Sequence, residues 1–82
     1  MYKLRYDRQV EAVWDSLPDQ ARYELADALR KVCQDPYSTT EAHPVEGSVR
    51  RILTLQHTAV TLLIIGPPFE RVYIRTINTL RS

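Results

Sequence analysis

Apolar residues recur at helical spacing in two neighbouring segments near the start of the chain. The first segment follows Asp7, whose side chain is suited to cap a helix, and predicts a helix over residues 8–16. The second begins with Pro18 and ends before Pro36, because the residue that precedes a proline is disfavoured in a helix. The apolar positions are Val10, Val13, Trp14 and Leu17 in the first segment and Ala21, Leu25, Ala28, Leu29 and Val32 in the second. The two helices should form a hairpin with one shared apolar side.

The rest of the chain shows the two-residue alternation of β-strands. Residues 2–6 alternate aromatic or aliphatic side chains with basic ones and predict a short first strand. Residues 36–48 are rich in proline, serine and threonine and predict one long loop. Three further strands are expected within residues 49–55, 59–65 and 71–80. Short turns join them, and Gly66-Pro67-Pro68 marks the second turn, so they should form an antiparallel meander.

The segment 59–65 is almost continuously hydrophobic, which is typical of a strand with neighbours on both sides and a covering of helices. Alternation divides its residues between two faces, Ala59, Thr61 and Leu63 on one and Val60, Leu62 and Ile64 on the other. We expect Leu63 to lie in the middle of the sheet, beneath the helix that carries Leu25 and Leu29.

The predicted order of elements, β-α-α-β-β-β, defines an α+β fold in which a helical hairpin backs an antiparallel sheet. A chain of 82 residues suits a single domain spanning residues 1–82. The lone cysteine, Cys33, excludes an internal disulfide and favours a reducing compartment. The charged N-terminus lacks the apolar region of a signal peptide, and the run Leu62–Ile65 is too short to span a membrane. We therefore expect a cytoplasmic protein without membrane contact.

The formal net charge of +1 hides an uneven distribution of charge. Residues 1–46 carry nine acidic and six basic side chains, whereas residues 47–82 carry five arginines and one acid, Glu70. Such an asymmetry indicates that the C-terminal half meets an anion, either phosphate or an acidic partner segment. The alternative is that charges of both signs only solvate a small surface.

Four segments are informative in combination: YKLRYDRQVEAVWDSLP, DALRKVCQDP, VRRILTL and VYIRTINTLR. In this order and spacing, over almost the whole chain, they resemble the RelE/ParE superfamily of bacterial toxin-antitoxin toxins. The resemblance implies a small basic sheet backed by a helical hairpin, and a cognate antitoxin as partner. Many members are endoribonucleases that inhibit translation by cleaving mRNA in the ribosome. Members of the ParE branch instead inhibit DNA gyrase without cleaving RNA, and a third alternative is a degenerate relative that mainly binds its antitoxin.

The resemblance also implies where RNA would be cleaved. In nuclease members, basic residues lie on the exposed face of the first meander strand, at the start of the middle strand and near the C-terminus. The corresponding strand positions here are Ile52, Thr54 and Thr61, so three expected cations are absent. Arg81 matches the C-terminal cation, and Arg50 and Arg51 match approximately, displaced toward the start of the first meander strand. Whether the chain is an enzyme is therefore left open.

Two further groups of residues complete the candidate site. His57, in the turn before the middle strand, could act as an acid or base near neutral pH, or could be an exposed turn residue with no task. We assign catalysis to Arg81, Arg51 and His57, and RNA binding to Arg50, Arg71, Tyr73 and Arg75. The last three alternate along one strand and should share a face, where a base or an antitoxin side chain could rest. We expect no metal and no cofactor, since no histidine or cysteine has partners at metal-ligand spacing.

Overall fold

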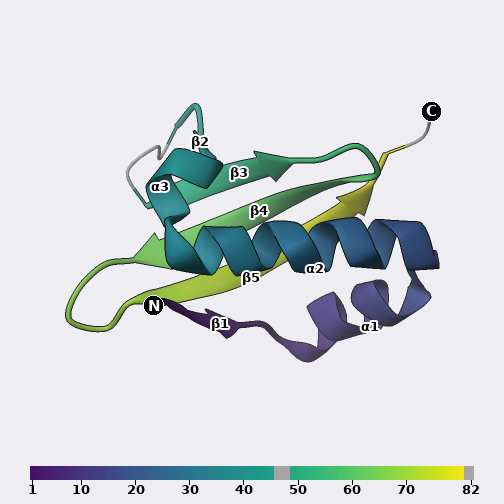
Figure 1. Ribbon diagram of the computed structural model, residues 1–82, viewed down its shortest axis with the longest axis horizontal. Helices are drawn as coiled ribbons and strands as arrows, with labels where there is room; N and C mark the ends of the chain where they lie inside the picture. The colour runs from purple at the N-terminus through teal and green to yellow at the C-terminus, as the bar shows by residue number, and fades with distance from the viewer. Residues whose placement is uncertain (46–48, 81–82) are drawn as a thin grey trace.

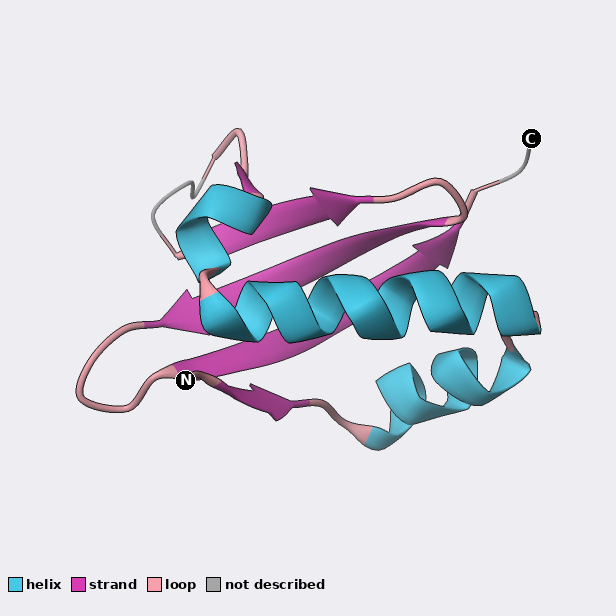
Figure 2. Cartoon of the chain, in the orientation of Figure 1, coloured by secondary structure: helices cyan, strands magenta, loops and turns pink. Residues whose placement is uncertain are grey.

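The computed structural model describes residues 1–45 and 49–80 of the chain (Figure 1). Two helices lie side by side over one face of a twisted sheet, and a short third helix lies at the end of the second (Figure 2). The described elements are β1 (Lys3–Arg5), α1 (Arg8–Ser16), α2 (Asp19–Gln34), α3 (Pro36–Thr39), β2 (Glu41–Ala42), β3 (Arg50–Thr54), β4 (Thr58–Ile65) and β5 (Arg71–Thr79). The predicted α+β fold, with its order of long elements, is confirmed.

The strands of the described ranges form one sheet in the order β1-β5-β4-β3-β2. Strands β3, β4 and β5 are antiparallel neighbours, so the predicted meander is confirmed. Strand β1 adds to the free edge of β5 and runs parallel to it, with Lys3 beside Arg71 and Arg5 beside Tyr73. The helical hairpin carries the chain from one edge of the sheet to the other, which makes this parallel pairing possible.

Local sequence signals fix the ends of the helices. The side chain of Asp7 accepts a hydrogen bond from Val10 N at 2.9 Å, which satisfies one of the free N–H groups of the first turn of α1. Pro18 is the N-cap of α2, which has Asp19 in its first turn, and Asp35 is the C-cap because Pro36 follows. The predicted bounds of both helices are therefore confirmed.

The segment predicted as one long loop contains two short elements. Pro36 begins α3, where a proline is tolerated because the first N–H groups of a helix have no partner within it. Strand β2 then pairs antiparallel with β3, with Glu41 opposite Ile52. The prediction of one long loop was wrong for these residues, since four- and two-residue elements are too short to show a hydrophobic period. Residues 46–48 of the predicted loop lie outside the described residues.

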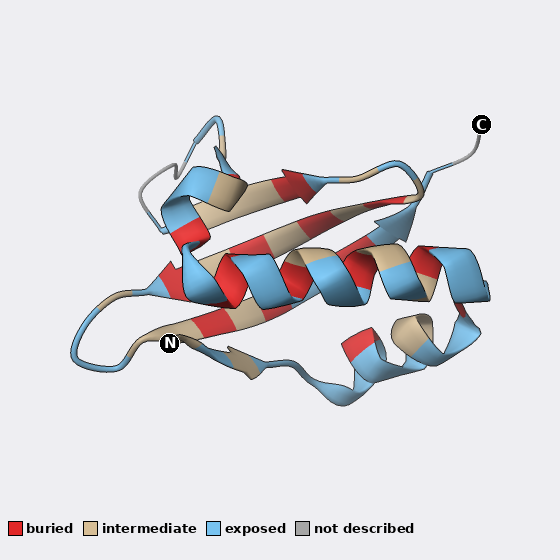
Figure 3. Cartoon of the chain, viewed as in Figure 1, coloured by how far each residue is buried: buried red, intermediate tan, exposed pale blue. Residues whose placement is uncertain are grey.

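The core lies between the helices and the sheet (Figure 3). Its most deeply buried members, each at most 1% exposed, are Leu25, Val32, Val60, Leu62 and Val72. Burial alternates strictly along β4 from Thr58 to Ile64, so the predicted division of this strand into two faces is confirmed. The face beneath the helices is, however, the one that carries Leu62. Leu63 lies on the opposite face and is only partly buried, so its predicted place beneath α2 was wrong.

A β-bulge in β5 allows apolar side chains on both sides of it to face the core. Thr61 pairs with Thr76 whereas Leu62 pairs with Ile74, which leaves Arg75 as an extra residue in β5. Ile74 and Ile77 are consequently both buried, although they are three residues apart, and Arg75 and Thr76 between them are both exposed. The bulge therefore places two successive side chains on the outer face.

None of the helices within residues 1–45 and 49–80 combines the length and the apolar character needed to cross a bilayer.

Candidate nucleic-acid interface

The sheet face turned away from the helices is here called the open face. It carries a row of side chains in which Tyr73 lies between two arginines further out. Strand register aligns Arg50 of β3 with Leu63 of β4, Leu63 with Tyr73 of β5, and Tyr73 with Arg5 of β1. Paired residues of neighbouring strands project to the same face, so these four side chains form one row across the sheet. Tyr73 thus lies between an aliphatic neighbour and a guanidinium.

A second pair of cations lies beside this row, towards the end of the sheet where β4 finishes. Arg71 is the register partner of Lys3 on one side and of Ile65 on the other. The Nε of Arg71 is buried and has no hydrogen-bond partner among the described residues. Arg75 projects to the open face from the bulge on the other side of Tyr73. The expected grouping of Arg71, Tyr73 and Arg75 agrees with this geometry, although their role in binding RNA stays a prediction.

Lys3 and Arg5 are the basic residues that sequence reasoning missed. Their alternation with Tyr2 and Leu4 was visible in the sequence and indicated a strand. Both residues, however, belong to the half of the sequence that is acidic overall, residues 1–46. Only the parallel pairing of β1 with β5 brings them to the cations of the C-terminal half.

The next row of the open face is neutral. Ile52 of β3 pairs with Thr61 of β4, and Thr61 with Thr76 of β5. The row beyond it contains Thr54, Ala59 and Asn78. The positions at which the family resemblance leads one to expect cations therefore do share the open face, and they carry hydroxyl and aliphatic groups instead. A phosphate held there would meet hydrogen-bond donors but no fixed positive charge.

Arg51 lies on the other side of the sheet, where it holds α3 to β3. Its Nε donates to Thr40 Oγ1 at 3.0 Å, and its Nη2 donates to the carbonyl oxygens of Thr40 at 2.8 Å and Tyr37 at 3.1 Å. The guanidinium carbon also lies 5.3 Å from the centre of the Tyr37 ring, within the range of a cation–π contact. These contacts give Arg51 a structural task, and its predicted catalytic role stays a prediction.

His57 lies in the β3–β4 turn, close to the last described residues of the chain. Its backbone N–H donates to Glu24 Oε1 at 3.0 Å, and its carbonyl oxygen accepts from Leu80 N at 2.9 Å. A small hollow beside it is lined by Pro18 and Ala21 at the start of α2 and by Leu80. Arg81, which follows Leu80, lies outside the described residues.

The candidate residues therefore separate into two groups, His57 beside the start of β4 and the residues Arg50, Arg71 and Tyr73 near its end. His57 precedes the first residue of β4, whereas Arg71 pairs with the last residue, Ile65. An eight-residue strand is about 24 Å long at roughly 3.4 Å per residue. The structure does not bring His57 together with Arg50, Arg71 and Tyr73, and no single reacting phosphate can contact both groups.

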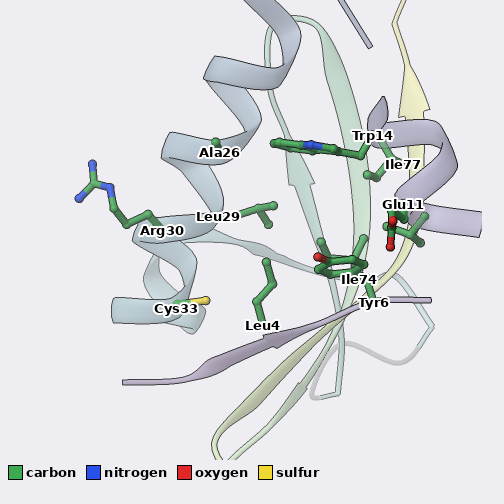
Figure 4. A pocket seen from close by; sticks show the side chains of 11 residues that line it. Leu4, Tyr6, Glu11, Trp14, Ala26, Leu29, Arg30, Cys33, Ile74 and Ile77 are labelled. Atoms are coloured by element: carbon green, nitrogen blue, oxygen red, sulfur yellow. The ribbon is translucent and has the colours of Figure 1, made fainter. Parts of the chain in front are cut away.

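An apolar cavity of about 400 Å³ lies on the other side of the sheet, between α1, α2 and the β1–β5 edge (Figure 4). Trp14 and Tyr6 form part of its wall, with Leu29 opposite them and Glu11 and Arg30 at its margin. Cys33 also lines it, and burial raises the pKa of this thiol. The cavity lacks the cations of the open face and is separated from it by the sheet.

Within residues 1–45 and 49–80, no group of three or more histidine, cysteine or acidic side chains is placed to hold a metal ion.

The architecture has the fold of the E. coli RelE toxin. Solved structures that share this fold include the following three, each at 15% sequence identity. The isolated E. coli RelE toxin matches with a TM-score of 0.82 over 100% of this chain and 87% of that chain. A chain of the intact E. coli RelBE toxin-antitoxin complex matches with a TM-score of 0.81 over 100% of both chains. A mutant E. coli RelE bound to a peptide of its antitoxin RelB matches with a TM-score of 0.78 over 99% of this chain and 85% of that chain.

No protein-family model matches the sequence, and no curated protein matches it. The fold anticipated from the sequence resemblance is confirmed by the structural matches, which cover essentially the whole chain.

Proposed function

We propose that this chain is the toxin of a two-component toxin-antitoxin module and is neutralised by a cognate antitoxin protein. The observation that carries the proposal is the match of the entire chain to RelE, at TM-scores of 0.78 to 0.82. Two of the structures described above are complexes with an antitoxin or an antitoxin peptide. An antitoxin is therefore the partner that this fold favours.

Controlled expression in a bacterial host tests the toxin proposal. Expression of the chain alone should slow growth, and co-expression of the product of the neighbouring gene should restore it. The empty vector and the neighbouring gene alone serve as controls. Normal growth with a high yield of folded protein, and no need for a neighbour, would contradict the proposal.

We further propose that the toxin inhibits translation by binding mRNA on the ribosome and cleaving it. The support is the open face, where Arg50, Arg71, Tyr73 and Arg75 project from the meander. Arginine suits the binding of phosphate because its planar fork donates in pairs and stays charged. Tyr73 among these cations offers a ring on which a base can stack.

Cleavage of an RNA strand by its own 2′-hydroxyl needs a base, an acid and cations. A base takes the hydroxyl proton, the oxygen attacks the adjacent phosphorus, and an acid protonates the departing 5′-oxygen. Cations must also stabilise the charge that develops on the phosphate. In this proposal His57 acts as the base or as the acid, and a water molecule takes the other role. Arg81 stabilises the phosphate, since residue 80 is hydrogen-bonded to His57. Arg51 would take part only after releasing its contacts to Thr40.

A second candidate function is inhibition by binding alone, as a gyrase-directed toxin or as a relative whose task is its antitoxin complex. The neutral row formed by Ile52, Thr61 and Thr76 favours it, because fixed cations are missing where the resemblance places the reacting phosphate. The distance between His57 and the cations around Tyr73 favours it as well. Cleavage of message by the purified chain separates the two candidates.

A further inference from the structure

We propose that strand β1 supplies half of a phosphate-binding surface at one edge of the open face, built from Lys3, Arg5, Arg71 and Tyr73. Its ligand is the phosphodiester backbone of a single-stranded nucleic acid. The inference rests on the proposed function, for which it names a binding site displaced from the neutral row. Figure 1 shows β1 lying beside β5 at this edge of the sheet.

The pairing of β1 with β5 fixes the direction of the side chains. Leu4 packs against the core and its register partner Val72 is fully buried, so both face the helices. Lys3 and Arg5, on either side of Leu4, therefore project to the open face and are exposed. Two backbone hydrogen bonds hold the start of the strand in place, from Tyr2 N to Cys33 O and from Lys3 N to Glu70 O, each 2.9 Å long.

The cations of this surface form no ion pair among the described residues. The ion pairs in residues 1–45 and 49–80 join Arg22 to Asp19, and Arg30 and Lys31 to Asp27, all on α2. None of them involves Lys3, Arg5, Arg71 or Arg75. The acid that register places on the open face is Glu41 in β2, at the opposite edge of the sheet. Lys3, Arg5 and Arg75 thus face solvent without an ion pair among the described residues. Glu70, which precedes Arg71, is one nearby acid against these cations, so the net positive charge favours an anionic ligand.

The spacing of these groups suits a nucleic-acid backbone better than an acidic peptide. Residues two apart in a strand are about 7 Å apart, and paired strands are separated by about 5 Å. The cations therefore form a lattice on which successive phosphates of an extended strand can rest. Tyr73 lies inside that lattice beside Leu63, so it offers a base a flat, partly apolar surface. A helical peptide would need an apolar groove. The apolar cavity lined by Trp14 and Leu29 lies on the other side of the sheet, beneath the helices.

The test measures binding of the full chain to fluorescently labelled strands of about twelve nucleotides over a range of salt concentrations. The probes are single-stranded RNA, single-stranded DNA of the same sequence, and a labelled acidic peptide. The variant is Lys3→Thr/Arg5→Thr, because threonine is favourable in strands. The matched control is Arg8→Gln/Lys31→Gln, which removes two charges from exposed positions on the helices. Melting temperatures of all three proteins establish that they are folded.

For the single strands, the slope of log affinity against log salt should fall by about 1.4 in the β1 variant, or about 0.7 for each lost phosphate contact. The control variant should keep the slope of the unmodified chain. A preference for RNA over DNA would mean that the surface recognises RNA. Equal binding would mean that it recognises the phosphodiester backbone of either nucleic acid. Both results support the proposal. An unchanged slope in the folded β1 variant would overturn it. Binding of the acidic peptide but of neither nucleic acid would overturn it too.

The binding experiment and the test for cleavage of message can succeed or fail independently of each other. A slope that falls in the β1 variant, with no cleavage of message by the unmodified chain, would support the binding surface and reject the nuclease. Cleavage by the unmodified chain, with an unchanged slope in the β1 variant, would support the nuclease and reject the binding surface.

Discussion

Glu24 of α2 holds the backbone of His57 in the turn between β3 and β4. Its carboxylate accepts from His57 N at 3.0 Å through Oε1 and from Gln56 N at 3.1 Å through Oε2. One side chain thus satisfies two N–H groups of a turn and ties it to the helix layer. The same turn receives the hydrogen bond from Leu80 N, so Glu24 indirectly positions the end of β5 next to the proposed acid–base residue.

Replacing Glu24 with alanine should therefore lower the free energy of unfolding by about 1–2 kcal/mol, because two charge-assisted hydrogen bonds are lost at a partly exposed site. Asp15→Ala, which removes an exposed carboxylate from α1, should change it by less than about 0.5 kcal/mol. Urea denaturation of the three proteins measures both values. Equal stability of the two variants would mean that the turn does not depend on Glu24.

The two faces of β4 should respond differently to truncation. Leu62 is fully buried beneath the helices, so Leu62→Ala should cost about 2–5 kcal/mol. Leu63 lies on the open face and is only partly buried, so Leu63→Ala should cost about 1 kcal/mol. These two variants change the same residue type at neighbouring positions and control for each other in thermal melts. A larger loss for Leu63→Ala would contradict the assignment of the two faces.

The thiol of Cys33 should be protected from alkylation in the folded protein. Burial raises its pKa, so the reactive thiolate is scarcer near neutral pH than for a free cysteine. Because the folded state then holds the thiol proton more tightly, this group lowers stability as the pH rises past the pKa of the unfolded thiol. Iodoacetamide labelling followed by mass spectrometry should be slow in buffer and fast in denaturant. Labelling in buffer at the rate of a small free thiol would disagree with the burial of Cys33.

How much of this structure the sequence could predict depends on how local each signal is. The bounds of α1 and α2 followed from Asp7, Pro18 and Pro36, which act on their own neighbours in the chain. The turn after β4 likewise followed from its glycine and prolines, and is closed by hydrogen bonds from Phe69 N and Glu70 N to Gly66 O. Signals of this kind need no knowledge of the tertiary structure.

Local signals could not predict which face of β4 lies under the helices or which strand lies at the edge of the sheet beside β5. Both faces of β4 are largely apolar, so alternation alone could not decide whether Leu62 or Leu63 lies under the helices. The parallel pairing of β1 is set by where the helical hairpin returns the chain, and it moves Lys3 and Arg5 into the candidate site. The contacts of Arg51 with Thr40 likewise depend on α3, which has no hydrophobic period to reveal it.

Arg81 is the residue on which the proposed chemistry most depends. Arg81→Ala should reduce cleavage of message by about a hundredfold or more, as expected when a fixed group that stabilises the transition state is removed. The melting temperature and antitoxin binding should stay unchanged, because the residue follows the last strand. Arg8→Ala, at the start of α1, is the control and should cleave normally. An Arg81→Ala variant that cuts as fast as the unmodified chain would remove Arg81 from the mechanism.

The most direct test of the account is to incubate the purified chain, free of antitoxin, with ribosomes programmed with a defined message and to map the 5′ ends of the message. We predict new ends inside the reading frame, which disappear when the antitoxin is added first. The absence of new ends, with protein shown by its melting curve to be folded, would contradict the nuclease proposal and favour inhibition by binding alone.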